Sequence, residues 1–159
     1  MAEISGQRLS FEPSAGFFCY WSGIRDSCGL LIKVAAKCFQ GAVSMEIAEA
    51  VAVLEGIHLA LSSDFSPIVV ATDALSVVHL CNAFSVSRCE VANVVVDVQL
   101  LLSQNSLFSI VFSPRNSNIA AHDVARWALS AGFAGTEANT RLVLVSAFGS
   151  NISINFASK

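Results

Sequence analysis

Charged residues are scarce in this sequence. Asp, Glu, Lys and Arg make up 13% of its 159 residues, whereas 54% are hydrophobic. Disordered chains show the opposite balance, so the composition favours one folded domain with a sizeable core. The net charge of −3 argues against binding nucleic acid by bulk electrostatics, because domains that do so usually have a basic surface. An enzyme that meets phosphate groups through bound metal ions is not excluded.

The sequence also lacks a long uninterrupted apolar run. The longest candidate, Ile47 to Leu61, is broken by Glu49, Glu55, Gly56 and His58. A membrane span would need about 18 or more apolar residues, so none is predicted. The N-terminus has no basic stretch followed by an apolar one, which argues against a secretory signal. We therefore expect an intracellular protein, cytoplasmic or nuclear, with no membrane partner.

Several motifs that carry known chemistry are missing. No GxSxG, GxxxxGK[ST] or GxGxxG segment occurs, which excludes serine hydrolases and nucleotide-binding folds of those kinds. No linker rich in Pro, Gly and Ser divides the chain. The cysteines form no CxxC pair and are odd in number, which favours ordinary buried thiols over a zinc or disulfide framework. They are Cys19, Cys28, Cys38, Cys81 and Cys89.

The order of the predicted elements indicates an α/β fold. An antiparallel strand hairpin comes first, and a parallel β-α-β core follows, which together make a mixed sheet with packed helices. In chain order we predict strands at 16–25 and 30–39, a helix from the N-cap Ser44 to about 62, a strand at 68–72, helices at 74–83 and 90–103, a strand at 107–112, a helix at about 118–130, and a late strand at 142–148. Residues 1–15 form an N-terminal segment that has either no regular structure or the first strand.

Two acids stand out within this order. Asp73 directly follows the buried strand at 68–72, at the carboxyl end where ligands gather in open α/β sheets. Glu49 lies one turn into the long helix, among alanines whose small side chains let that face approach the sheet closely. Because Asp and Glu are usually solvated surface groups, the pair alone is a weak sign of a metal site.

The wider pattern resembles the ribonuclease H type 1 superfamily, in particular its plant reverse-transcriptase-like domains. The matching segments are GIRDSCGLL at 23–31, MEIAEAVAVLEGIHLAL at 45–61, VVATDALSVVHL at 69–80 and VFSPRNSNIAAHDVARWAL at 111–129. They follow one another in the family's order, over about residues 8–130. The resemblance implies a five-stranded mixed sheet, an antiparallel hairpin plus parallel strands, flanked by helices. It places the domain at 8–131 and leaves 132–159 as a C-terminal tail.

The resemblance also implies an activity. Enzymes of the family hydrolyse the RNA strand of an RNA–DNA hybrid with two Mg²⁺ ions, or possible Mn²⁺ substitutes, held by four carboxylates. Glu49 matches the helix glutamate, and Asp73 matches the strand-end aspartate. The family's first aspartate lies in a segment like Leu-Asn-Phe-Asp-Gly, for which RLSFEPS here offers Glu12. The last position falls on His122, and neutral imidazole is a poor Mg²⁺ ligand.

Three further residues match a loop that touches the phosphate backbone in the family. They are Arg115, Asn116 and Asn118, and a turn followed by a helix cap explains them equally well. Two functions stay open at this point. One is a nucleic-acid-binding RNA–DNA hybrid endoribonuclease with weakened activity. The other is an inactive ribonuclease H-like binding or scaffold module derived from a retroelement.

Overall fold

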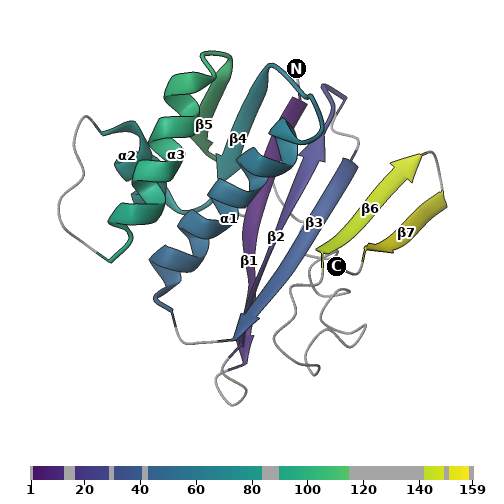
Figure 1. The fold of residues 1–159 in the computed structure, drawn as a ribbon, viewed down its shortest axis with the longest axis horizontal. Helices are drawn as coiled ribbons and strands as arrows, with labels where there is room; N and C mark the ends of the chain where they lie inside the picture. Colours follow the sequence, from purple (N-terminus) through teal and green to yellow (C-terminus); the bar gives the residue numbers. More distant parts are fainter. Residues whose placement is uncertain are drawn as a thin grey trace.

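The computed structural model describes residues 2–12, 17–28, 31–40, 43–83, 90–114, 142–148 and 151–157. This part of the chain contains three helices and seven strands (Figure 1). In chain order they are β1 (Ala2–Glu12), β2 (Phe17–Arg25), β3 (Leu31–Gln40), α1 (Met45–Leu61), β4 (Ile68–Thr72), α2 (Leu75–Asn82), α3 (Ala92–Gln104), β5 (Phe108–Phe112), β6 (Leu142–Phe148) and β7 (Asn151–Ala157).

The seven strands form one mixed sheet in the order β5-β4-β1-β2-β3-β6-β7. β1, β4 and β5 are parallel to one another, whereas β2 is antiparallel to both β1 and β3. These five strands confirm the predicted mixed sheet of an antiparallel hairpin plus parallel strands. The late strand predicted at 142–148 is β6, and it pairs with β7 in a second hairpin that extends the sheet beyond β3.

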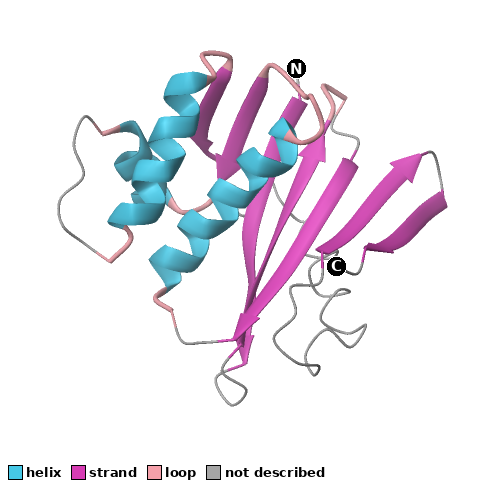
Figure 2. Cartoon of the chain, viewed as in Figure 1, coloured by secondary structure: helices cyan, strands magenta, loops and turns pink. Residues whose placement is uncertain are grey.

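The three helices cover one face of the sheet (Figure 2). α1 lies across β1 and β2, while α2 and α3 lie toward β4 and β5. The core between the layers is built from branched aliphatic side chains, each of which stabilises the fold by about 1.5–3 kcal/mol when fully buried. The largest fully buried ones are Ile4, Ile24, Ile57, Ile68, Val53, Val70, Val77, Val91 and Val95.

Local signals explain where α1 begins and ends. The Ser44 side chain accepts a hydrogen bond from the Ile47 backbone N–H at 3.3 Å, which confirms the predicted N-cap. At the other end, Lys33 of β3 donates from Nζ to the Ser63 hydroxyl oxygen at 2.6 Å. A cation near the last turn of a helix is favourable because it opposes the helix dipole. Both ends of α1 are thus fixed by side-chain hydrogen bonds.

The N-terminal segment, for which the sequence left open whether it forms a strand, is a central strand of the sheet. It forms β1, which starts at Ala2 and lies between β4 and β2 in the middle of the sheet. The sheet therefore begins before residue 8. The helix predicted at about 118–130 lies outside the described residues. Within the described ranges, no helix is both long and apolar enough to span a membrane.

Candidate active site

Glu49 lies on the side of α1 that faces the sheet. Together with Val53, Gly56 and Ala60 it follows the spacing i, i+4, i+7, i+11, which forms one stripe along a helix. The other three residues of the stripe are buried. Glu49 is half-buried, and its Oε2 is shielded from solvent. The helix therefore holds this acid against the sheet instead of pointing it into solvent.

The approach of α1 to the sheet is unusually close. A Cβ atom added at Gly56 would lie only 2.9 Å from Cγ2 of Ile4 in β1. Nearby, the Ser22 hydroxyl of β2 donates a buried hydrogen bond of 3.0 Å to the Ala52 carbonyl oxygen. The three alanines next to Glu49 in the sequence are also buried. The helix carrying Glu49 is therefore fixed in position over β1 and β2.

Asp73 directly follows β4, as the sequence predicted. Thr72 before it is fully buried, and its Oγ1 accepts a hydrogen bond of 3.2 Å from the Ala74 backbone N–H. The Thr72 carbonyl oxygen accepts another, of 2.9 Å, from the N–H of Ser113 just beyond β5. These bonds fix the turn into α2 at the carboxyl ends of β4 and β5. Asp73 is half-buried at this edge.

Glu49 and Asp73 lie at the same height along the sheet. The close contact of Gly56 places that residue over Ile4, which is paired with Val70 in β4. α1 runs opposite to β1 and β4 (Figure 1). Going back along α1 from Gly56 to Glu49 therefore covers about 10 Å of sheet, at 1.5 Å per residue. The same distance along β4, at about 3.3 Å per residue, leads from Val70 to Asp73.

Glu12 lies farther along the sheet. The pairing of β1 with β4 ends with Ser5 beside Ala71. Glu12 is seven positions beyond Ser5 on β1, or about 23 Å at 3.3 Å per residue, and it pairs with Phe17 of β2. The register of β1 therefore does not bring Glu12 to Asp73.

Ser5 pairs with Ala71, two residues before Asp73, and the register continued from there brings Gln7 to the height of Asp73. The segment AEISG at residues 2–6 has the alternation of the family segment Leu-Asn-Phe-Asp-Gly, with Ser5 where the aspartate stands. This segment has no acid at that position, whereas the similar segment RLSFEPS contains Glu12. The sequence signal for this segment is Gly6, which follows Ser5 as glycine follows the aspartate in the family segment.

The described part of the site thus contains two carboxylates. Within those residues, no group of three or more His, Cys, Asp or Glu side chains is placed to hold a metal ion. His122, Arg115, Asn116 and Asn118 lie outside the described residues, and their roles stay predictions. Burial raises the pKa of the Cys81 thiol on α2 to about 11, which keeps it neutral and makes it no candidate nucleophile. Cys28, by contrast, is exposed in the turn after β2.

Solved structures of ribonucleases H share this fold. Ribonuclease H1 from the halophilic archaeon Halobacterium salinarum superposes with a TM-score of 0.69 and 20% identity, over 82% of this chain and 98% of that one. LC11 ribonuclease H1, solved in complex with an RNA/DNA hybrid, superposes with a TM-score of 0.66 and 15% identity, over 81% of this chain and 99% of that one. The N-terminal ribonuclease H domain of rv2228c from Mycobacterium tuberculosis superposes with a TM-score of 0.63 and 18% identity, over 80% of this chain and 97% of that one.

The sequence itself matches one family, described as reverse transcriptase-like, over residues 23–128. No curated protein matches it. The family match begins within β2, runs through α1, β4, α2, α3 and β5, and contains both Glu49 and Asp73. The chain therefore belongs to the reverse transcriptase-like family and has the fold of a type 1 ribonuclease H.

Proposed function

We propose that this domain binds RNA–DNA hybrid and cleaves its RNA strand slowly. The observation that supports this is the common height of Glu49 and Asp73 at the carboxyl end of β4. Two proteins of similar fold, LC11 ribonuclease H1 and a foamy viral protease-reverse transcriptase, were solved in complex with RNA/DNA hybrid. Hybrids are selected by groove shape and 2′-hydroxyl groups, which a protein of net charge −3 can use without a strongly basic surface.

Mg²⁺ is the cation that suits the two acids, with Mn²⁺ as a substitute. Mg²⁺ prefers oxygen ligands, keeps several waters and uses one or two protein carboxylates. Glu49 and Asp73 are therefore a fitting donor set for one hydrated ion. Two ions about 4 Å apart need additional carboxylates, which the described residues do not supply. A bound ion would supply positive charge toward the phosphate of the substrate.

The residues of this chain explain why cleavage should be slow. α1 is packed tightly enough to hold the Glu49 carboxylate in place, and the turn at Thr72 does the same for Asp73. On β1, however, the residue that would take the place of the family's first aspartate is Ser5, which has no carboxylate. Errors of about 1 Å in an active site can reduce a rate about 100-fold, and the loss of a charged ligand is a larger change. We expect a comparable or greater reduction here.

The direct test uses labelled RNA–DNA hybrid with Mg²⁺ and, separately, with Mn²⁺. Glu49→Gln and Asp73→Asn should each reduce the cleavage rate about 100-fold or more, because each removes a proposed metal ligand. Glu55→Gln is the matched control, since Glu55 lies on the same helix six residues later, about 120° around the helix from Glu49. Its rate should stay within about twofold of wild type. Equal activity in Glu49→Gln and wild type would refute the proposed site.

A second candidate is a module that binds hybrid without cutting it. The serine at the β1 position favours this candidate. Fluorescence anisotropy with hybrid, double-stranded RNA and double-stranded DNA separates the two. Binding that prefers hybrid, with no cleavage in either metal, would select the binding module. Absence of hybrid binding at about 0.1 M salt, from folded protein, would contradict both candidates.

A further inference from the structure

The three helices in the described part of the chain, α1, α2 and α3, carry acids and no Lys or Arg. Their charged residues are Glu46, Glu49, Glu55 and Asp97. The basic residues in the described part of the chain all lie on strands, and they are Arg8, Arg25, Lys33 and Lys37. Because Glu49 faces the sheet, the charge on the outer face of these helices comes from the other three acids, which favour a partner that brings positive charge.

The same face exposes an apolar ridge. Val96 and Leu100 on α3 are 51% and 53% exposed. They are four residues apart, so they stand one above the other along the helix. Neighbouring exposed aliphatic side chains are more informative than single ones, because contiguous apolar surface marks contact sites for other molecules.

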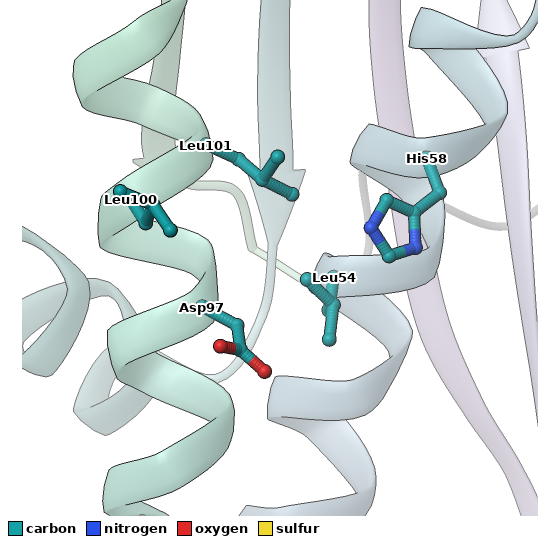
Figure 3. Close-up of a pocket in the computed structure, with 5 residues that line it drawn as sticks. All are labelled: Leu54, His58, Asp97, Leu100 and Leu101. Carbon is teal, nitrogen blue, oxygen red and sulfur yellow. The ribbon is translucent and has the colours of Figure 1, made fainter.

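A groove lies beside this ridge, between α1 and α3. Leu54 and His58 of α1 line one wall, and Asp97, Leu100 and Leu101 of α3 line the other (Figure 3). Its volume is about 180 Å³. Sites for cofactors and drug-sized ligands measure about 300–1,000 Å³, whereas a cavity of about 150 Å³ holds a benzene molecule. The groove is therefore the size of one Leu, Ile or Phe side chain.

The polar groups of the groove determine which ligand groups can lie next to the apolar side chain that fills it. The carboxylate of Asp97 points from α3 toward α1, and the imidazole of His58 points toward α3 (Figure 3). Both residues are exposed. Since the described helices contain no Lys or Arg, a partner that carries a cation can pair with Asp97.

We propose that the groove between α1 and α3 is a docking site for a short amphipathic helix of a protein partner. One apolar side chain of that helix enters the groove, a Lys or Arg about one turn away meets Asp97, and its flank packs on Val96 and Leu100. Helices dock in grooves between two helices by such anchors at i, i+3 or i+4. Nucleic acid is disfavoured by the acids of this face. A second copy of the chain would bring the same acids opposite one another.

The test uses the full chain and a pair of labelled synthetic helices. The first is an alanine-based peptide with two leucines four residues apart, flanked by lysines; the second has glutamates in place of the lysines. Fluorescence anisotropy should show binding of the lysine peptide in the range of about 10–100 µM, and at least about tenfold weaker binding of the glutamate peptide. Asp97→Lys should reverse this preference.

Asp64→Lys is the matched control, because it makes the same charge change at an exposed position in the loop after α1. It should leave the affinity for the lysine peptide within about twofold. Leu100→Glu should weaken that peptide at least about tenfold, because it places an acid on the apolar ridge. Equal binding of both peptides, no binding up to about 1 mM, or equal effects of Asp97→Lys and Asp64→Lys would overturn the proposal. Self-association of the chain that Leu100→Glu abolishes would overturn it in favour of a second copy.

Discussion

The two sides of α1 differ in how tightly they pack. The side toward the sheet is a closely packed seam. A Cβ atom added at Gly56 would lie only 2.9 Å from Cγ2 of Ile4, and the Ser22 hydroxyl donates a hydrogen bond to the Ala52 carbonyl oxygen. The side toward α3 leaves an open groove beside Leu54 and His58. The tight side also holds Glu49, whereas the open side holds none of the residues proposed for cleavage.

This difference teaches which part of the helix fixes the site and which part is free for another role. Close packing leaves little room for adjustment, so a helix packed in this way keeps an acid in one position. An exposed groove is not constrained by close packing, so its side chains are free to contact a partner. One helix can therefore support hybrid cleavage on one side and protein docking on the other.

The largest effect should come from filling the tight seam. Gly56→Leu should lower the free energy of unfolding by about 3 kcal/mol, because the new side chain meets Ile4 and Ser22 with no space to enter. His58→Leu, on the open side of the same helix, should change it by no more than about 0.5 kcal/mol. Urea unfolding of both variants measures the difference. Similar losses in the two would show that the sides do not differ as described.

A smaller effect should come from the buried hydrogen bond in the same seam. Ser22→Ala removes the donor to the Ala52 carbonyl and should cost about 1 kcal/mol of unfolding free energy. Ser109→Ala makes the same change at an exposed position of β5 and should cost less than about 0.5 kcal/mol. Thermal unfolding compares them. If the two substitutions cost the same, the Ser22 bond adds nothing to the seam.

A pH-dependent effect concerns the burial of Cys81 under the helical layer. Burial raises its pKa from 9.0 to about 11, so the unfolded chain ionises first as pH rises. The unfolded state then binds fewer protons than the folded state, and this part of the stability, complete below pH 9, is lost between about pH 9 and 11. Unfolding across this range should therefore show a steeper decline for wild type than for Cys81→Ala. Identical slopes would mean that the thiol is not shielded.

Local sequence signals predicted the helix that carries Glu49 and the strand that ends before Asp73. Strand pairing, in contrast, determines which residues of β1 lie near them. Ser44 marked the start of α1, and small neighbours and a strand end marked Glu49 and Asp73. None of these signals depends on residues distant in the sequence. The position of β1 does depend on them, because its register is set by pairing with β4 and β2. Residue type therefore predicted Glu12, whereas the register places Ser5 beside Ala71, two residues before Asp73.

The most direct measurement is hybrid cleavage by Ser5→Asp beside Glu12→Gln. If Ser5 takes the place of the family's first aspartate near the end of β4, Ser5→Asp adds the missing carboxylate and should raise the cleavage rate about tenfold or more, equivalent to about 1.4 kcal/mol. Adding Glu49→Gln to that variant should remove the gain, and Glu12→Gln should leave the wild-type rate unchanged. Loss of cleavage in Glu12→Gln, with no gain in Ser5→Asp, would contradict the account.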